Sequence, residues 1–170
     1  ALKYAFLRYK MGGDIVFDPK ESVAMTGNSG VYLLYSAVRA KKVLAKSDEL
    51  SAQSAGEPGS SKESPSLSPK RVSALQDSIV ARSASTIFER NLSRKVVQYE
   101  DVLDEAILEK APYKICTYLY ELAQEFSRFY EQVRVVGGGH EDVTEKYVRV
   151  YVGVMEQGLG LLGIEVPEEM

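Results

Sequence analysis

The sequence contains very few of the residues on which most enzyme chemistry depends. Its 170 residues include no tryptophan, one cysteine (Cys116) and one histidine (His140). A single cysteine excludes an internal disulfide and a cysteine-rich metal cluster, and a single histidine argues against histidine-based metal sites and triads. No apolar run approaches the roughly 20 residues that a membrane span requires, and the first residues do not resemble a secretory signal. We therefore expect a cytoplasmic protein with no membrane contact.

The chain also lacks an excess of positive charge. Its 21 Lys and Arg residues stand against 24 Asp and Glu residues, for a net charge of −3. Proteins that bind nucleic acid without specificity are usually strongly basic, so a nucleic-acid role here would depend on where a few cations lie. The length suffices for one domain with a proper core. The start, Ala1-Leu2-Lys3-Tyr4, reads as mid-protein sequence, and we expect a fragment of a longer polypeptide.

Hydrophobic periodicity predicts an all-α fold, a bundle of about four to five helices. Residues 1–10 read as the end of a helix. The predicted helices of the bundle cover residues 31–46, 75–94, 99–110, 112–133 and 142–158, with a possible break between Ser93 and Gln98.

Residues 47–73 differ from the rest of the chain in composition. They are rich in Ser, Gly, Pro, Lys and Glu and have almost no large apolar residues. Such a segment cannot bury enough apolar area to offset its chain entropy. We predict a flexible Ser-rich insert between two helices.

The predicted helix 31–46 carries the clearest functional pattern. Aromatic and then cationic residues recur at spacings of three and four, which places them along one face. Tyrosine rings can stack on the unpaired bases of an RNA loop, and Lys and Arg can meet its phosphates. An equally simple interpretation is that the tyrosines pack on another helix and the cations form a solvated face. The residues of this row are Tyr32, Tyr35, Arg39, Lys42 and Lys46.

Other candidate sites are weaker. The run Gly137-Gly138-Gly139-His140 lacks the Lys-Ser/Thr of a phosphate-binding loop, so we expect an interhelical turn with an exposed histidine. Cys116 lies near the edge of an apolar face, and we expect a packed thiol. The acidic residues between Glu100 and Glu109 lack the spacing of a calcium loop. We find no catalytic constellation.

Three separated stretches resemble the arginyl-tRNA synthetase family, specifically the C-terminal DALR-type anticodon-binding domain of these class I enzymes. They occur in the order of that family, and the resemblance covers nearly the whole chain except residues 47–73. The stretches are Gly27-Asn28-Ser29-Gly30-Val31-Tyr32-Leu33-Leu34-Tyr35-Ser36-Ala37-Val38-Arg39; Ala111-Pro112-Tyr113-Lys114-Ile115-Cys116-Thr117-Tyr118-Leu119-Tyr120-Glu121-Leu122-Ala123 with Phe126 and Phe129-Tyr130; and Arg149 with Gly158 to Met170.

The resemblance implies a domain organisation and a function. Residues 1–26 would be the link out of the catalytic domain, and residues 27–170 the anticodon-binding bundle. The full enzyme would join arginine to tRNA(Arg), using ATP and Mg²⁺. The class I catalytic motifs are absent, so this fragment would be inactive alone and hold no metal or cofactor. Its partners would be tRNA(Arg) and the missing N-terminal and catalytic domains, in a monomeric protein.

The resemblance also implies site residues. The positions matching Tyr32, Tyr35, Arg39 and the terminal Met170 face the anticodon loop in the family, and we add Lys42 and Lys46 as phosphate contacts. We expect residues 161–170 to fold back and place Met170 near the Tyr35–Arg39 face.

One departure supports a different function. Leu34 stands where glutamine is common in the family, and the loss of that polar group, with the net acidity of the chain, suits an alternative. In that alternative the domain is a helical interaction or scaffold module that kept the fold without RNA binding.

Overall fold

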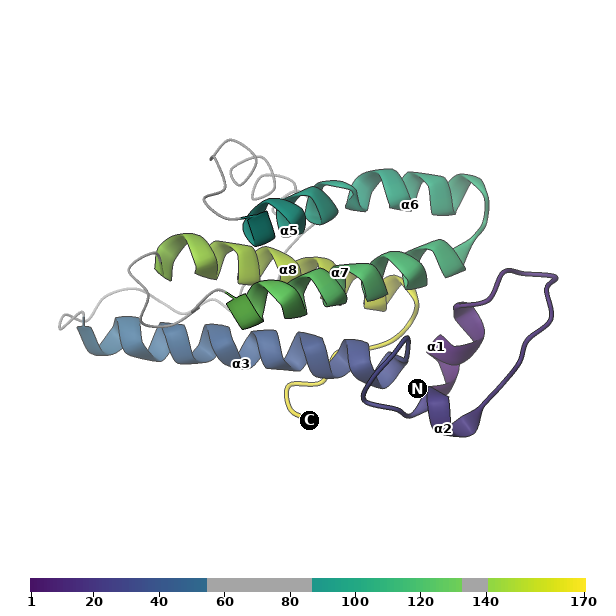
Figure 1. Cartoon of the computed structure of the whole chain (residues 1–170), viewed down its shortest axis with the longest axis horizontal. Helices are drawn as coiled ribbons and strands as arrows, with labels where there is room; N and C mark the ends of the chain where they lie inside the picture. Colours follow the sequence, from purple (N-terminus) through teal and green to yellow (C-terminus); the bar gives the residue numbers. More distant parts are fainter. Residues whose placement is uncertain (55–86, 133–140) are drawn as a thin grey trace.

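The computed structural model describes residues 1–54, 87–132 and 141–170, and within these ranges all regular structure is helical. The all-α prediction is confirmed. Figure 1 shows the long helices running side by side, with two short N-terminal helices at one end. The short helices are α1 (Leu2–Leu7) and α2 (Pro19–Ser22), and the bundle is formed by α3 (Gly30–Ser54), α5 (Ile87–Val97), α6 (Tyr99–Leu108), α7 (Pro112–Gln132) and α8 (Glu141–Leu161). No described helix is long and apolar enough to cross a membrane.

Helix α7 is the centre of the bundle and packs against α3, α5, α6 and α8. It begins at Pro112, where a missing backbone N–H costs little. Its apolar face is buried as the periodicity predicts, and the ring of Phe126 stacks on Tyr151 of α8 with centroids 3.9 Å apart. The fully or almost fully buried residues of this face are Tyr118, Leu119, Leu122, Ala123, Phe126 and Phe129.

Helices α5 and α6 meet at Gln98, within the break that the sequence predicts. Tyr99 is 3% exposed, and its ring lies 5.7 Å from that of Tyr118. The Tyr118 hydroxyl donates to the Lys95 carbonyl at 2.7 Å. The junction is therefore fixed to α7 on both sides of the break.

The predicted end of α3 at Lys46 is wrong, because the helix continues to Ser54. Two tertiary contacts hold the extension: Ser47 Oγ donates to Glu145 at 3.1 Å, and Asp48 pairs with Arg149 at 2.6 Å. The composition of residues 47–54 predicts a linker. Their contacts with α8 outweigh this weak local preference for a non-helical conformation. The rest of the predicted insert, residues 55–73, lies outside the described residues.

The start of α3 is set by the Gly27-Asn28-Ser29-Gly30 run. Ser29 Oγ accepts the backbone N–H of Tyr32 at 3.0 Å, which satisfies a donor that the helix itself leaves unpaired. A Cβ atom at Gly30 would lie 2.9 Å from Cβ of Tyr4, so only glycine allows α1 this close. The turn therefore also fixes the position of the aromatic and cationic residues that follow it on α3.

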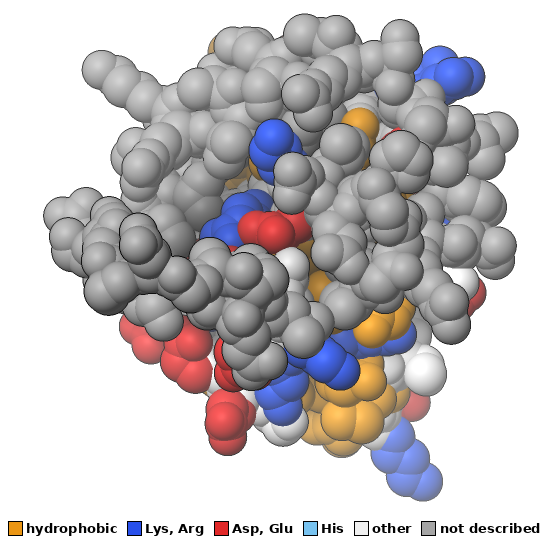
Figure 2. Space-filling model, turned by 90° about the vertical axis from the view of Figure 1, so that its left-hand side faces the viewer, with side chains coloured by type: hydrophobic (Ala, Val, Ile, Leu, Met, Phe, Trp, Pro, Cys, Tyr) orange, Lys and Arg blue, Asp and Glu red, His pale blue; other side chains and the backbone are white. Residues whose placement is uncertain are grey.

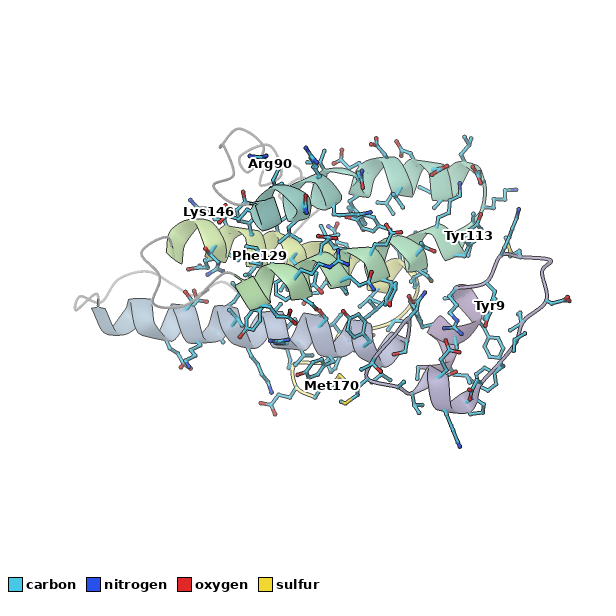
Figure 3. All side chains as sticks on the ribbon, in the orientation of Figure 1. Tyr9, Arg90, Tyr113, Phe129, Lys146 and Met170 are labelled. Carbon is cyan, nitrogen blue, oxygen red and sulfur yellow. The ribbon has the colours of Figure 1, made fainter. Side chains whose placement is uncertain are left out.

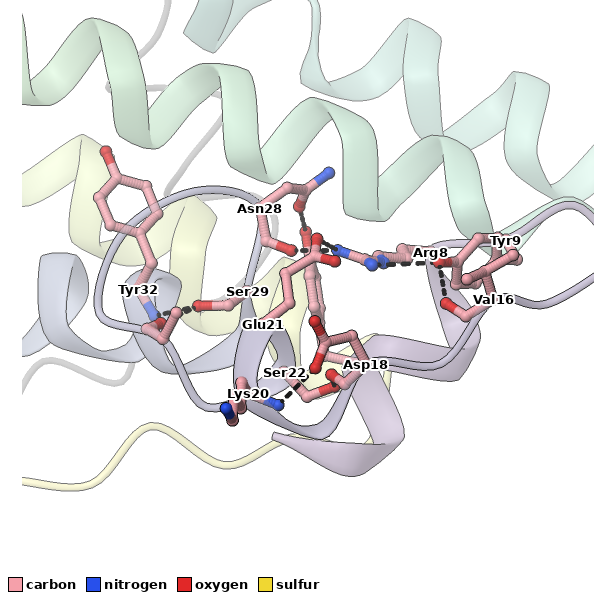
Figure 4. A network of polar contacts seen from close by, with 12 residues as sticks. Arg8, Tyr9, Val16, Asp18, Lys20, Glu21, Ser22, Asn28, Ser29 and Tyr32 are labelled. Atoms are coloured by element: carbon pink, nitrogen blue, oxygen red, sulfur yellow. Dashed lines mark hydrogen bonds and ion pairs between the residues drawn. The ribbon is translucent and has the colours of Figure 1, made fainter.

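Residues 1–26 are tied to the bundle by buried and polar contacts. Tyr4 is fully buried, and its hydroxyl lies 2.6 Å from Asn28 Oδ1 and 3.1 Å from the Cys116 carbonyl oxygen. Arg8 pairs with Glu21 at 2.7 Å and donates to the Asn28 carbonyl at 2.8 Å (Figure 4). The segment predicted as a link thus contributes a side chain to the core. The boundary at residue 26 stays a prediction.

Candidate nucleic-acid interface

The outer face of α3 presents a row of aromatic and cationic side chains to solvent. Tyr35 is 42% exposed, Lys42 and Lys46 are exposed, and Arg39 is half-buried. At about 100° per residue, these four side chains fall within roughly 60° of one another around the helix. We call Tyr35, Arg39, Lys42 and Lys46 the α3 row.

Arg39 is held by an aromatic ring of the neighbouring helix. Its Cζ atom lies 4.0 Å from the centre of the Tyr130 ring on α7, within the range of a cation–π contact. Tyr130 is itself half-buried against the core. The spacing of Tyr130 along α7 matches the buried face of that helix, so the sequence alone assigns it to the core and gives no sign of its contact with Arg39.

Tyr32 lies in the interface between α3 and α7. Its ring makes an edge contact with Tyr120 at 5.8 Å, and its hydroxyl lies 3.3 Å from Ser127 Oγ. The packing interpretation of the tyrosines therefore describes Tyr32, whereas Tyr35 is open to solvent. An RNA contact by Tyr32 stays a prediction.

The chain reverses direction after α8 at a glycine. Gly163 has φ +67°, its N–H donates to the Gly160 carbonyl, and the Ile164 N–H donates to the Leu159 carbonyl, both at 2.9 Å. This pair of bonds is the Schellman motif, in which a left-handed residue ends a helix. Ile164 then packs against the core. The motif turns the following residues back toward α3.

Residues 162–170, which we call the tail, turn back from the end of α8 and cross α3 (Figure 1). Lys3 Nζ donates to the Gly163 carbonyl at 2.7 Å, and Lys41 Nζ of α3 lies 3.2 Å from Glu168. Met170 is 52% exposed and lies beside α3 in Figure 3. Contact between Met170 and RNA stays a prediction.

The cations of the α3 row have no carboxylate partner among the described residues, a property that they share with other exposed cations such as Lys20 and Lys110. Neither Lys42 nor Lys46 forms an ion pair in the described part of the chain, whereas Lys114 bridges Glu105 and Glu109 at 2.8 and 2.7 Å. Figure 2, which views the molecule from the end at which α3 finishes, shows Lys and Arg side chains between acidic and hydrophobic ones. Unpaired cations can bind phosphates without first breaking a salt bridge.

The other candidate sites within the described ranges show no catalytic or metal-binding group. Cys116 is fully buried, and burial raises the pKa of its thiol to about 12, so it is a packed thiol as predicted. No group of acidic, histidine or cysteine side chains in the described ranges could hold a metal ion. Residues 137–140 lie outside those ranges.

Comparison with known proteins gives the context of this geometry. Residues 33–170 match the family model described as the DALR anticodon binding domain. Among curated proteins, the chain is 28% identical to an arginine–tRNA ligase of Agathobacter rectalis and 30% identical to one of Rhodopirellula baltica. All of the chain aligns, but it covers only 26% and 24% of those proteins. The chain thus spans about a quarter of the length of these relatives.

Solved structures agree on the fold. The arginyl-tRNA synthetase of Thermus thermophilus matches 99% of the chain with a TM-score of 0.72 at 23% identity. That of Plasmodium falciparum matches the same share with a TM-score of 0.74 at 19% identity. Nothing in these comparisons supports the scaffold alternative. The family model covers most of the chain, and the chain belongs to the DALR anticodon-binding domain family.

Proposed function

We propose that this chain recognises the anticodon loop of tRNA(Arg) as part of an arginine–tRNA ligase. The observation that carries the proposal is the α3 row: an exposed tyrosine, an arginine held by an aromatic ring and two unpaired lysines on one helix face. The relatives are named arginine–tRNA ligases, and from these names we take tRNA(Arg) as the RNA and arginine as the amino acid. The tail, which contacts α3 at Lys41, would add an apolar side chain, Met170, to the same surface.

Each residue of the row suits a different part of an RNA loop. The exposed ring of Tyr35 offers a stacking platform for an unpaired base, which is worth about 1–3 kcal/mol in known cases. Arg39 keeps its N–H donors in one plane over Tyr130, ready for a base edge or a phosphate. Lys42 and Lys46 continue the cationic line along the helix toward the neighbouring phosphates. Because these contacts are local, the net charge of −3 does not oppose them strongly.

The ligation chemistry belongs elsewhere in such an enzyme. ATP and Mg²⁺ would bind outside this chain, whose described side chains hold no metal-ligand group. The chain would supply recognition while the catalytic domain joins arginine to the tRNA. We place such a protein in the cytoplasm as a monomer.

The test replaces the two central residues of the row in the full-length protein. Tyr35→Ala combined with Arg39→Ala should weaken tRNA(Arg) binding by about tenfold or more, from the loss of one stacked base and one cation, and should leave ATP binding unchanged. The matched control is Tyr113→Ala with Arg94→Ala, which removes the same side chains from α7 and α5, away from α3. Unchanged tRNA affinity in the first double variant would remove the site assignment.

A further inference from the structure

Lys41 joins three segments that are distant in sequence. Its Nζ atom lies 2.7 Å from Glu156 Oε1 of α8 and 3.2 Å from Glu168 Oε1 of the tail. The Lys41 side chain is 18% exposed, whereas that of Glu168 is 87% exposed. Burial opposes the charge of Lys41, but its hydrogen bonds to Glu156 and Glu168 outweigh burial and raise its pKa. The lysine therefore stays charged at neutral pH and can hold both carboxylates.

Lys41 does not belong to the α3 row, although it precedes Lys42 directly. Successive residues differ by about 100° around a helix, so its side chain leaves α3 on another side. Val38, one turn earlier, is 3% exposed, although it lies about 140° from Leu33 and about 100° from Ala37, which both face the core. Figure 1 shows the tail crossing α3, and the Lys41–Glu168 contact puts this crossing on the Lys41 side of the helix. Lys41 thus marks where the tail is seated.

Two contacts fix the tail at its two ends. Lys3 holds the turn at Gly163, and Lys41 holds Glu168. Met170 follows Glu168 by two residues, so it can lie no more than about 7 Å of extended chain beyond this anchor. Without the Lys41–Glu168 contact, the anchor nearest to Met170 would be the packed side chain of Val166.

We propose that Lys41 is a positioning residue for RNA recognition: with Glu156 and Glu168 it forms a clasp that holds Met170 beside the α3 row. Lys41 itself does not contact RNA in this arrangement. The clasp adds a positioning residue to the proposed function and rests on it, since its effect is measured as a change in tRNA affinity.

Two explanations of Glu168 predict opposite changes in tRNA affinity when this residue is replaced. If Glu168 acts only as a negative charge near RNA, Glu168→Gln reduces repulsion and tightens tRNA binding. If Glu168 anchors the tail, the same change weakens tRNA binding, by about two- to fivefold, the value of one such ion pair. Glu169→Gln is the matched control, because Glu169 forms no ion pair within the described ranges and its loss should leave the affinity equal or slightly higher. Tighter binding by the Glu168 variant overturns the proposal.

Salt dependence and coupling separate positioning from direct contact. Lys41→Gln should weaken tRNA binding while leaving the slope of log affinity against log salt unchanged, because a lost phosphate contact would reduce that slope by about 0.7–0.9. In a variant ending at Pro167, which lacks the anchored residues, Lys41→Gln should change the affinity by less than about twofold. A reduced slope, or an undiminished effect in the shortened variant, assigns Lys41 to the RNA contact surface and overturns the clasp.

A cross-link tests the clasp without RNA. A zero-length carbodiimide reagent applied to the full-length protein should join Lys41 to Glu168 and Lys41 to Glu156, as mapped by mass spectrometry. Absence of the Lys41–Glu168 product overturns the clasp and leaves the proposed function standing. If instead the cross-link forms and the Tyr35/Arg39 double variant binds tRNA normally, the assignment of the α3 row as the tRNA site fails, and the clasp has a structural role only.

Discussion

Arg39 of α3 and Tyr130 of α7 link the exposed row to the buried core. The Arg39 Cζ atom lies 4.0 Å from the centre of the Tyr130 ring, and that ring in turn lies 6.2 Å from the ring of the buried Phe126. An arginine on a packed ring loses less freedom on binding than one that moves in solvent. The orientation of Arg39 therefore depends on how α3 and α7 pack against each other.

Replacing Tyr130 should weaken RNA binding without removing any of the predicted contacts. Tyr130→Leu keeps an apolar side chain against Phe126 but removes the ring beneath Arg39. We expect tRNA affinity to fall about two- to fivefold, since a cation–π contact at a partly exposed site is worth about 0.5–1 kcal/mol. Tyr130→Phe keeps the ring and should bind as the unaltered protein does. Equal affinity of the Leu and Phe variants, measured at one salt concentration, would contradict this role.

The two lysines of the row should affect salt dependence more than specificity. Lys42→Gln and Lys46→Gln should each reduce the slope of log affinity against log salt by about 0.7–0.9, the value of one phosphate contact. Binding of tRNA(Arg) and of an unrelated tRNA should weaken by similar factors, because phosphates carry no sequence information. Lys10→Gln, at an exposed position of the N-terminal segment, is the control. If the slopes of the Lys42 and Lys46 variants equal that of the control, these lysines do not contact phosphates and are only exposed to solvent.

Two glycines of α8 should respond to alanine in opposite directions. At Gly158 an added Cβ would lie 2.7 Å from Cδ2 and 3.1 Å from Cδ1 of Leu119, which is fully buried and cannot swing away. We expect Gly158→Ala to lower the free energy of unfolding by about 1–3 kcal/mol. At Gly160 nothing lies within 4 Å, and Gly160→Ala should raise it by about 0.4–1 kcal/mol, since alanine restricts the unfolded chain. Urea unfolding of both variants gives the comparison, and destabilisation at Gly160 would contradict it.

The Arg8–Glu21 pair should make stability depend on acidic pH. Its hydrogen bond from Arg8 lowers the pKa of Glu21 in the folded protein, so folding favours the ionised carboxylate. The stabilisation is therefore present above the ordinary pKa of about 4.3 and is lost as pH falls through the lower, folded value. Glu21→Gln should be less stable than the unaltered protein near neutral pH and equally stable in strong acid.

The measurement is urea unfolding at several pH values from about 6 down to about 3, where such carboxylates titrate. Glu169→Gln, an exposed carboxylate with no ion pair in the described ranges, should follow the unaltered protein throughout. A Glu21→Gln curve parallel to that of the unaltered protein would show that the pair contributes nothing.

The sequence predicts a helix best where the spacing of its apolar residues is enough to show which face is buried. In α7, the burial of Leu122 and Phe126 follows directly from their spacing. The end of α3 could not be predicted, because Ser47 and Asp48 depend on partners about a hundred residues away in α8. Local composition contains no information about such partners.

The candidate site shows the same division. The exposed position of Tyr35 follows from its place on the helix, and the ordered motifs point to the family. The support of Arg39 by Tyr130 could not be predicted, because it depends on how α3 and α7 are set against each other. The clasp at Lys41 is unpredictable from sequence for a similar reason: its three members come from α3, α8 and the tail.

The seat of the tail on α3 also has a consequence for synthesis on the ribosome. Val38 emerges from the ribosome long before Val166 and Glu168, since chains are made from the N-terminus. If the tail is what covers Val38, α3 exposes apolar side chains on two sides until these late residues arrive, Leu33 toward the unfinished core and Val38 toward solvent. Nascent chains of this protein should therefore be chaperone substrates until the tail has emerged, and a product that stops short of the tail would keep exposed apolar surface that quality control can detect.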